Sequence, residues 1–445
     1  MSETESYREA IEALEALARQ PVLPARQVGL DRANRLLAEV GNPEHSFRAV
    51  HVTGSSGKGS TTTMCGAILE AAGFRTGYLR SPHLASYTER IAVGPLPIPE
   101  QAWVKYWAQL QPLVEAMAAG NLAGHTAGRP TFSEVIFAIA ALHFRDSRVQ
   151  WAALEAGLGG RYDATNVVES DVAVVTTVSL EHTQMLGDTV AAIATEKAAI
   201  IKPGSGAVTG ATEPEALMVI EERARSVGAP LLRVPADIPF DVQALSLEGT
   251  RLTVEIGDRP IDLHLCMLGG FQGRNAAVAA AAVTMLRRRG LPVDRTAIVR
   301  GLKQARLPGR LEVIQRKPLV IVDGAHHAAA VEALRAELDR LLAGRRVVLL
   351  FTALSDKNIP AMASHLRDLA DTIVLTAAPG TPRAMHSKAL ARDFSGPARL
   401  LLEDDPAAAL ELALESAGKD GVLVVCGSLY LVGFVREILL RSRVL

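Results

Sequence analysis

The stretch from His51 to Thr61 constrains the fold of this chain more than any other part of the sequence. It reads His-Val-Thr-Gly-Ser-Ser-Gly-Lys-Gly-Ser-Thr and continues a short apolar segment that starts at residue 49. A helix is predicted to begin where this stretch ends and to run to about residue 72. Strand, glycine-rich loop and helix in this order predict a P-loop, in which backbone N–H groups and the positive end of the helix dipole hold a phosphate group.

Each residue type in this loop has a use in phosphate binding. The glycines free the backbone, Lys58 adds a full positive charge, and Ser60 or Thr61 can place a hydroxyl on the Mg²⁺ that accompanies the phosphates. We therefore predict that the nucleotide-binding residues of the loop are Gly54, Ser55, Ser56, Gly57, Lys58, Gly59, Ser60 and Thr61. The spacing departs from the general Walker A pattern, so a glycine-rich turn of an unrelated α/β protein is the alternative.

Length and charge exclude several classes of function. The 445 residues predict two or three domains, and 47 basic against 48 acidic residues give no overall charge that would attract nucleic acid or an anionic membrane. No apolar run approaches the ~18 residues of a membrane-spanning helix, and the acidic N-terminus lacks a signal-peptide core. We therefore expect a soluble, cytoplasmic protein. Cys65, Cys266 and Cys426 lie far apart and are expected to be buried small hydrophobes.

Polar residues follow predicted strands at several places in the first half of the chain. Glu155, Ser81, His83 and His182 each stand at or just beyond the end of such a strand. Open α/β sheets collect their ligands at the carboxyl ends of the strands. Glu155 also precedes a glycine-rich turn, as a Walker B carboxylate does, and it is therefore the first candidate for a Mg²⁺ contact.

From residue 319 onward the sequence alternates between strands and helices. The predicted strands are 319–322, 347–351, 372–375, 398–402 and 422–425, and the predicted helices are 327–342, 359–369, 388–393, 406–416 and 429–440. This alternation predicts an open, largely parallel sheet with helices on both faces. Before it, residues 230–265 favour a small β structure. We place two domains at residues 1–301 and 302–445.

These features, in this order, resemble the folylpolyglutamate synthase and dihydrofolate synthase family, a branch of the ATP-dependent Mur ligases. The resemblance runs from about residue 7 to the C-terminus. It rests on the motifs Gly41-Asn-Pro-Glu44, Gly57-Lys-Gly-Ser60, Ser81-Pro-His-Leu84 with Glu89-Arg-Ile91, Glu155-Ala-Gly-Leu-Gly-Gly-Arg161 with Asp163-Ala-Thr-Asn166, Glu196-Lys-Ala198, Gln272 with Asn275, Pro308-Gly-Arg-Leu-Glu312, Asp323-Gly-Ala-His326 and Gly427-Ser-Leu-Tyr430. Each motif alone is weak evidence, but together and in register they are strong evidence.

The resemblance implies both a fold and a reaction. The fold is α/β, with a Mur-ligase-type P-loop ATPase domain that carries a small β subdomain, followed by a Rossmann-like α/β C-terminal domain. The enzyme would phosphorylate a carboxylate of a folate or dihydropteroate-like acceptor with ATP and join L-glutamate to the acyl phosphate. The implied cofactors are ATP and Mg²⁺ at two sites, and the implied protein is a monomer that acts in folate biosynthesis and one-carbon metabolism.

The same resemblance assigns roles to individual residues. The catalytic set would be Lys58, Glu155, His182, Lys197 and His326. Ser60, Ser81 and Glu155 would hold the first Mg²⁺. His182 and a carbamylated Lys197 would help to hold the second, with Glu155 bridging, because a carbamate supplies the kind of oxygen ligand that this hard cation prefers.

Further residues are implied to contact the ligands. Asn275, Arg310 and Asp323 would bind the nucleotide. The substrate-binding residues would be Ser81, His83, Asp163, Asp323, His326 and His327. Closure of one domain on the other would then complete the site and exclude water from the acyl phosphate.

Several positions depart from the usual family pattern. Ser55-Ser56 replaces Thr-Asn, Glu181 replaces Asp, Ala199 replaces Gly, and His327 replaces the Asn that closes the Asp-Gly-Ala-His motif. These changes motivate a rival function, a Mur-type ligase that joins an amino acid to a non-folate acid. A second rival is a non-catalytic ATP-binding homologue.

Individual site residues also have structural explanations. His182 and His326 can be histidines whose hydrogen bonds only support the fold. Lys197 can be a solvated lysine on a helix surface, and Asp163 with Asn166 can cap and shape the turn that follows the Walker B position.

Overall fold

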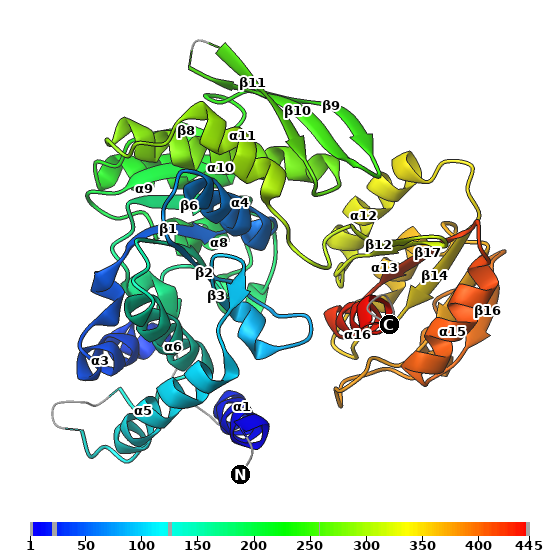
Figure 1. The fold of residues 1–445 in the computed structure, drawn as a ribbon, viewed down its shortest axis with the longest axis horizontal. Helices are drawn as coiled ribbons and strands as arrows, with labels where there is room; N and C mark the ends of the chain where they lie inside the picture. The colour runs from blue at the N-terminus through cyan, green and yellow to red at the C-terminus, as the bar shows by residue number, and fades with distance from the viewer. Residues whose placement is uncertain (1–2, 20–24, 123–126, 258, 442–445) are drawn as a thin grey trace. The chain divides into compact units, whose positions relative to one another are not determined.

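The computed structural model describes residues 3–19, 25–122, 127–257 and 259–441 of the chain. The chain forms two compact units (Figure 1). The first comprises Met1–Asp241, Leu252–His264 and Phe271–Ala305, and the second comprises Val242–Arg251, Leu265–Gly270 and Arg306–Leu445. Residue 301, where we placed the domain boundary, lies in the last helix of the first unit. The assignment of domains at residues 1–301 and 302–445 stays a prediction.

An eight-stranded sheet organises the first unit. Its strands lie in the order β4-β3-β2-β5-β1-β6-β7-β8. They are β1 Arg48–Thr53, β2 Thr76–Leu79, β3 Ile91–Val93, β4 Leu96–Pro97, β5 Trp151–Glu155, β6 Val172–Val175, β7 Gly206–Thr209 and β8 Leu231–Arg233. The strands from β2 to β8 in this order run parallel, whereas β3 and β4 add an antiparallel edge. Strands β5, β6 and β7 are buried along their whole length, as their continuous apolar sequences predict for a covered parallel sheet.

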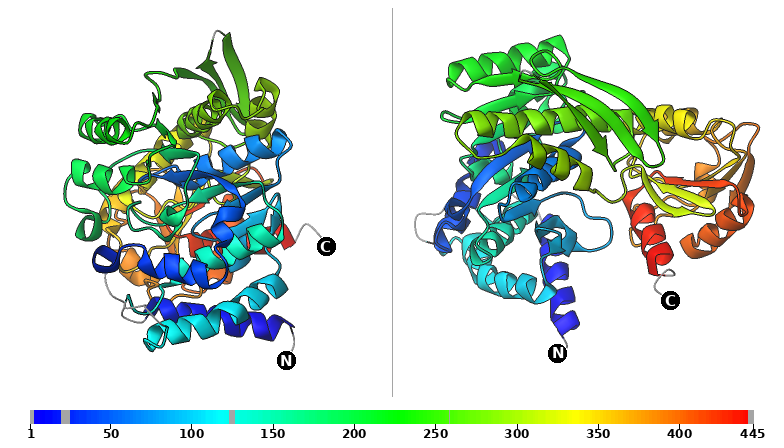
Figure 2. Two further views of the ribbon diagram at one scale, coloured as in Figure 1. Left: turned by 90° about the vertical axis from the view of Figure 1, so that its left-hand side faces the viewer. Right: turned by 45° about the horizontal axis from the view of Figure 1, so that its top comes forward.

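Helices pack around this sheet (Figures 1 and 2). They are α1 Glu3–Arg19, α2 Ala25–Val28, α3 Asp31–Glu39, α4 Lys58–Ala71, α5 Glu100–Ala118, α6 Phe132–Asp146, α7 Thr183–Leu186, α8 Val190–Ala198, α9 Pro214–Ser226, α10 Gly270–Arg288 and α11 Arg295–Gln304. Three short 3₁₀ turns are η1 Pro43–Ser46, η2 Tyr87–Arg90 and η3 Ala164–Val167.

Helix α4, which follows the P-loop, is buried on nearly every side. A Cβ atom on Gly66 of this helix would lie 2.1 Å from the ring of Tyr78 in β2. On another side, a Cβ atom on Gly301 of α11 would lie 2.4 Å from the Cα of Ile68. Because only glycine permits such close approaches, these two residues allow the sheet and α11 to pack closely against the P-loop helix.

The second unit contains the predicted alternation of strands and helices. Its six-stranded sheet has the order β12-β13-β17-β14-β15-β16. The strands are β12 Glu312–Arg316, β13 Leu319–Val322, β14 Val347–Phe351, β15 Thr372–Leu375, β16 Arg399–Leu402 and β17 Val422–Cys426. The helices are α12 Ala328–Leu341, α13 Ile359–Leu366, α14 Ser387–Leu390, α15 Pro406–Ala417 and α16 Leu429–Arg441. All neighbours pair in parallel except β12 with β13, an antiparallel edge that the sequence analysis did not predict.

A three-stranded sheet lies where the sequence favoured a small β structure. Its strands are β9 Phe240–Ser246, β10 Gly249–Ile256 and β11 Arg259–Leu265, in the order β11-β10-β9 (Figures 1 and 2). Among the helices of the described residues, none is both long enough and apolar enough to cross a membrane.

Candidate active site

The P-loop connects β1 to α4 at the carboxyl edge of the first sheet. Gly57 adopts a left-handed conformation with φ 82° directly before α4, and no side chain caps this helix. The N–H groups of the first helical turn therefore point toward an open anion position. Gly54 has φ 151°, and a Cβ atom there would lie 1.9 Å from the Thr176 hydroxyl oxygen. Because both residues have a positive φ, which side chains rarely tolerate, glycine is required at both positions.

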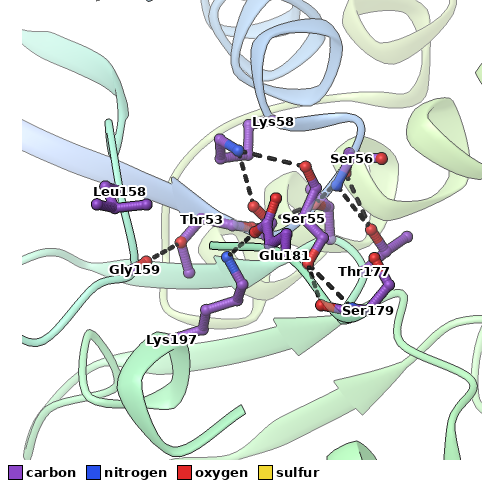
Figure 3. A network of polar contacts seen from close by, with 12 residues as sticks. Thr53, Ser55, Ser56, Lys58, Leu158, Gly159, Thr177, Ser179, Glu181 and Lys197 are labelled. Atoms are coloured by element: carbon purple, nitrogen blue, oxygen red, sulfur yellow. Dashed lines mark hydrogen bonds and ion pairs between the residues drawn. The ribbon is translucent and has the colours of Figure 1, made fainter. Parts of the chain in front are cut away.

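Residues that follow β6 hold the loop in shape (Figure 3). The Ser55 N–H donates to Thr177 O at 2.8 Å, and the Ser56 N–H donates to Thr177 Oγ1 at 2.9 Å. The Ser55 hydroxyl also accepts a hydrogen bond from the Ser179 N–H at 3.0 Å. The Ser-Ser pair that departs from the family pattern therefore binds the neighbouring loop.

Lys58 folds back over the loop (Figure 3). Its Nζ donates hydrogen bonds to Gly54 O at 2.8 Å and to Ser55 O at 3.4 Å. A phosphate oxygen is a stronger partner for an ammonium group than a neutral carbonyl. Lys58 is therefore placed to exchange these contacts for a phosphate. Ser60 and Thr61, in the first turn of α4, are both buried.

Asn275 of α10 lies against the P-loop. A Cβ atom on Gly57 would lie 2.3 Å from Asn275 Oδ1. The other end of this amide donates from Nδ2 to Gln272 Oε1 at 2.9 Å. Gln272 has no exposed surface and so fixes the direction of the Asn275 amide. The sequence placed both residues in one motif but gave Gln272 no role.

Glu155 and Ser81 meet beside the P-loop. Strand β5 lies between β1 and β2, and Glu155 at its end is paired with Val52 of β1. The Ser81 N–H, just beyond β2, donates to Glu155 Oε2 at 2.9 Å. Glu155 is only 5% exposed. Three adjacent parallel strands thus bring the phosphate loop, a buried carboxylate and a serine to one edge, as the sequence predicted.

A buried ion pair lies close to Lys58. Lys197, near the end of α8, is 1% exposed, and its Nζ donates to Glu181 Oε1 at 2.7 Å (Figure 3). Burial lowers the pKa of Lys197, although Glu181 opposes this shift. Burial raises the pKa of Glu181, but the charges of Lys197 and Lys58 outweigh it and hold that pKa below its usual value. The alternative of a solvated Lys197 is therefore wrong.

His182 stands in a different environment from Lys197. It precedes α7 with φ 45°, and its side chain is exposed. The structure thus brings Glu181, rather than the adjacent histidine, into direct contact with Lys197. The sequence had named Glu181 only as a departure from the family pattern, because nothing in the spacing shows which side chain reaches the buried amine.

Asp163 is committed to the loop that follows Glu155. Its Oδ2 accepts hydrogen bonds from the N–H groups of Gly157 and Leu158 at 2.8 and 3.0 Å. Its Oδ1 accepts from the Thr165 N–H at 3.1 Å and from the Thr165 hydroxyl at 2.5 Å. These contacts support the alternative in which Asp163 shapes the turn, and its substrate-binding role stays a prediction.

His83 is held by its neighbours in the loop beyond β2. Its Nδ1 accepts a hydrogen bond from Arg90 Nε at 2.9 Å, and its ring lies 4.2 Å from the ring of Tyr87. Burial, aided by the charge of Arg90, lowers the pKa of His83 to about 4. His83 is therefore a neutral ring at physiological pH.

In the second unit, Asp323 ends the first strand of the alternating pattern. Its two carboxylate oxygens accept hydrogen bonds from the N–H groups of Leu311 and Ala325, both at 2.7 Å. Burial raises the pKa of Asp323, while the charge of Arg310 and these two donors oppose the shift. A Cβ atom on Gly324 would lie 2.2 Å from Arg310 Nη1, so this glycine makes room for the guanidinium group.

His326 and His327 have different hydrogen bonds. His326 Nδ1 lies 2.7 Å from Gly324 O, and because a carbonyl only accepts, Nδ1 carries the proton. Burial lowers the pKa of His326, so the neutral ring keeps a lone pair on Nε2. His327 instead precedes α12, where its Nδ1 accepts a hydrogen bond from the Ala330 N–H at 3.3 Å. It therefore acts as the N-cap of that helix.

Comparison with known proteins gives these sites a family. Residues 105–283 match the Mur ligase middle domain, and residues 309–429 match the Mur ligase, glutamate ligase domain. A Bacillus subtilis protein named dihydrofolate synthase/folylpolyglutamate synthase is 35% identical over 413 residues, which are 92% of this chain and 94% of that protein. The chain belongs to the folylpolyglutamate synthase and dihydrofolate synthase family.

Solved structures agree with this assignment. Mycobacterium tuberculosis folylpolyglutamate synthase, complexed with ADP and AMPPCP, is 30% identical with a TM-score of 0.87 over 98% of this chain and 99% of that chain. Escherichia coli FolC, in complex with DHPP and ADP, is 30% identical with a TM-score of 0.81 over 98% of each chain. The family resemblance, the Mur ligase fold and the class of ATP-dependent ligase are therefore confirmed. The two rival functions receive no support from these relatives.

Among the described residues, no group of three or more His, Cys, Asp or Glu side chains could hold a metal ion. At the carboxyl edge of the first sheet, Glu155 offers a buried carboxylate, one oxygen of which accepts the Ser81 N–H. A single carboxylate is compatible with Mg²⁺, because this ion commonly keeps water and substrate phosphates as its other ligands.

Proposed function

We propose that this chain adds L-glutamate to the carboxylate of a folate or dihydropteroate-like acceptor, with ATP as phosphate donor and an acyl phosphate as intermediate. The observation that carries the proposal is the meeting of Glu155 and Ser81 beside the P-loop. The relatives support the choice of ligands, since the M. tuberculosis protein was solved with ADP and AMPPCP and the E. coli protein with DHPP.

The first unit binds and orients the triphosphate. The N–H groups of the P-loop and of the first turn of α4 receive the phosphate oxygens, and Lys58 leaves the Gly54 carbonyl to join them. Asn275, oriented by Gln272, contacts the nucleotide from α10. These groups lower the repulsion between the triphosphate and the approaching carboxylate, which is the main barrier to this reaction.

The first Mg²⁺ fits the residues that the structure provides. Glu155 would contribute a buried carboxylate oxygen, and Ser60 and Ser81 would contribute hydroxyl oxygens. All three are hard oxygen donors of the kind that Mg²⁺ prefers. When bound, the ion neutralises charge on the phosphates as the phosphoryl group moves to the acceptor.

The second Mg²⁺ fits only if Lys197 is modified. As an ammonium group beside Glu181, Lys197 repels a cation. Reaction of its neutral amine with CO₂ forms a carbamate and releases one proton, which replaces the positive charge by an anionic oxygen ligand. Burial lowers the pKa of Lys197 and so raises the fraction of reactive amine. We keep His182 as a proposed ligand of this ion on the family resemblance; its side chain is exposed.

The second unit receives the amino acid. The ammonium group of L-glutamate must lose a proton before its nitrogen can attack the acyl phosphate. His326 offers the lone pair on Nε2 for that proton, since its Nδ1–H is held by Gly324 O. Arg310 supplies a positive charge for an anionic oxygen of a ligand, and Asp323 holds the turn that carries it.

Phosphate release measured with Mg-ATP and L-glutamate tests this function. The acceptor is dihydropteroate, tetrahydrofolate or absent, and product mass is read in parallel. We expect acceptor-dependent phosphate release and a mass gain of one glutamyl residue. The acceptor that works also settles which of the two family activities the chain has. The monomeric state and the cytoplasmic location stay predictions.

A matched pair of lysine variants controls the assay. Lys58→Ala is expected to abolish turnover, whereas Lys419→Ala, at an exposed lysine of the second unit, is expected to leave it unchanged. Turnover that persists in Lys58→Ala would remove the P-loop from the mechanism. If ATP binds but no folate-type acceptor stimulates phosphate release, the acceptor assignment is wrong.

A further inference from the structure

His51 is a fully buried histidine that the mechanism above does not use. It lies within β1, the strand that delivers the P-loop, and has no exposed surface. Its Nε2 lies 2.7 Å from the Thr165 hydroxyl, a contact between residues far apart in the sequence. A buried histidine in a strand is usually a packing residue, so the direction of this hydrogen bond decides whether it does more.

Hydrogen-bond counting fixes that direction. The Thr165 hydroxyl has one proton and donates it to Asp163 Oδ1 at 2.5 Å. It can therefore only accept from the histidine, so His51 carries its proton on Nε2. His51 Nδ1 is buried and has no hydrogen-bond partner. A second proton there would find no acceptor, and the neutral Nε2–H tautomer is the form that fits the site.

The network ends on the turn that follows Glu155. Asp163, which receives the Thr165 proton, accepts the N–H groups of Gly157 and Leu158 with its other oxygen. These two residues come directly after the segment that carries the Mg²⁺ carboxylate. The chain of contacts therefore runs from the strand of the P-loop, through two side chains, to the backbone of the Glu155 turn.

The same face of β1 contacts this turn through a second side chain. Thr53 lies two residues beyond His51, and its hydroxyl donates to Gly159 O (Figure 3). On its far side the turn abuts the helix of Lys197, because a Cβ atom on Gly160 would lie 2.8 Å from the carbonyl oxygens of Glu196 and Lys197. The turn is thus enclosed between β1 and the end of α8.

We propose that His51 is a positioning residue: through Thr165 and Asp163 it fixes the turn after Glu155, and so sets the place of Glu155 and Lys197 relative to the P-loop on its own strand. This inference rests on the proposed function for its effect on turnover, because that function places Glu155 at the Mg²⁺. It adds to that function a positioning role for His51, which itself touches no ligand.

Two matched pairs of variants test the proposal. His51→Leu removes the donor, while His51→Gln keeps an N–H donor on a side chain of similar reach. Thr165→Val removes the hydroxyl at nearly constant shape, while Thr165→Ser keeps it. We expect the two apolar variants to lower kcat by about ten-fold to a hundred-fold, the scale of a small misplacement of catalytic groups. We expect the two polar variants to retain most of it.

The affected constants separate positioning from general loss of structure. In His51→Leu the apparent constant for Mg²⁺ should rise together with the fall in kcat, while KM for L-glutamate, assigned to the second unit, should stay unchanged. In ¹⁵N NMR of the wild-type protein, His51 should show a protonated Nε2 and an unprotonated Nδ1. An equal loss in His51→Gln and His51→Leu, or an unchanged kcat and Mg²⁺ constant in both apolar variants, would overturn the proposal.

A second readout keeps this test apart from the proposed function. Mg²⁺-dependent binding of AMPPCP needs no acceptor and no turnover. If the wild type shows no ligase activity, the proposed function fails, and the Mg²⁺ dependence of AMPPCP binding in the same four variants still decides the role of His51. A dependence unchanged from wild type in the apolar variants would then reject it.

Discussion

The ion pair between Lys197 and Glu181 yields a prediction that reports on the state of the proposed second metal site. Lys197 is 1% exposed and Glu181 is 24% exposed, so the two partners differ greatly in their access to water. Glu181→Gln leaves the Lys197 ammonium group buried without the carboxylate that it contacts. Lys197→Met removes the buried charge itself and leaves a carboxylate that water can reach. The two single substitutions should therefore have unequal effects.

The magnitudes follow from this asymmetry. Removing one partner of a buried ion pair costs about 3–5 kcal/mol, because the remaining charge is uncompensated. The glutamine oxygen of Glu181→Gln can still accept a hydrogen bond from Nζ, so we expect the lower end, about 3 kcal/mol. For Lys197→Met we expect about 1 kcal/mol, the usual net loss of one hydrogen bond. The double variant should be more stable than Glu181→Gln alone, because it no longer buries an unpaired charge.

Tryptophan fluorescence during urea unfolding measures these differences in unfolding free energy for the first structural unit, which contains the ion pair. The chain has 3 tryptophans, Trp103, Trp107 and Trp151, and all lie in the first unit with the ion pair. The buffer contains neither CO₂ nor Mg²⁺, so that Lys197 is unmodified. Glu221→Gln is the control, because its ion pair with Arg233 is in the same unit but is exposed on both sides. It should cost less than about 1 kcal/mol.

Two outcomes would contradict this reasoning. If Glu181→Gln costs no more than the Glu221→Gln control, Lys197 does not depend on Glu181 for its charge. If Glu181→Gln is more stable than the wild type, Lys197 is not an ammonium group, because the substitution then loses no charge attraction and removes a carboxylate whose charge burial disfavours. That second result is the one expected once bicarbonate and Mg²⁺ are added, if Lys197 becomes a carbamate, and a ¹³C signal from labelled bicarbonate would identify it.

Three further predictions concern other residues of the site. Gly57→Ala places a Cβ atom 2.3 Å from Asn275 Oδ1 at a residue with φ 82°, so fluorescent-nucleotide titration should show at least about ten-fold weaker binding, and unchanged affinity would contradict the crowding argument. Burial lowers the pKa of His51 from 6.5 to about 3, so between these pH values the unfolded chain binds a proton that the folded chain does not. The unfolding free energy should therefore fall by about 1.4 kcal/mol per pH unit as the pH drops below 6.5. The variant His51→Gln should lack this contribution. Asp323→Asn turns an amide N–H₂ toward one of two backbone donors, which should destabilise the second unit by about 1–3 kcal/mol in calorimetry while leaving the tryptophan transition unchanged.

The parts of the site that could be predicted from sequence share one physical origin. Parallel strands place their carboxyl ends at the same edge, so a residue that follows a buried strand is near other such residues whatever their distance in the chain. Glu155 and Ser81 were found in this way, and they lie within one hydrogen bond of each other. The glycines of the P-loop were found because their conformation has few substitutes.

Contacts that depend on side-chain direction could not be predicted. Lys197 lies 16 residues after Glu181 in the sequence, and only the packing of α8 shows that its amine points inward to that carboxylate. Asp163 has the same residue type whether it contacts a substrate or its own loop, and the sequence alone does not show its four hydrogen bonds within the loop. In the sequence, His51 is only a polar residue between the apolar residues Val50 and Val52.

The edge strand β12 shows a similar limit for the fold. Its residues Glu312–Arg316 are partly exposed and carry charged side chains at both ends, so they lack the continuous apolar run that marks the parallel strands. An antiparallel edge strand needs one covered face only, and a five-residue strand of this kind is too short for its alternation to stand out. The predicted sheet was therefore correct in its parallel part and incomplete at its edge.

The departure at His327 can now be separated from the question of substrate. An asparagine before a helix caps it by accepting a backbone N–H, and His327 accepts the Ala330 N–H through Nδ1 in the same position. The substitution thus preserves the local hydrogen bond, and α12 begins where the family motif ends. Because Nδ1 of His327 is an acceptor, a proton on this ring is on Nε2, whereas His326 carries its proton on Nδ1. The two adjacent rings therefore use Nδ1 in opposite ways, as a donor in His326 and as an acceptor in His327. His326 is the better candidate to take a proton from an amine, because its Nε2 keeps a lone pair. His327 and asparagine therefore differ in size and in ring chemistry, but not in the hydrogen bond with which α12 begins.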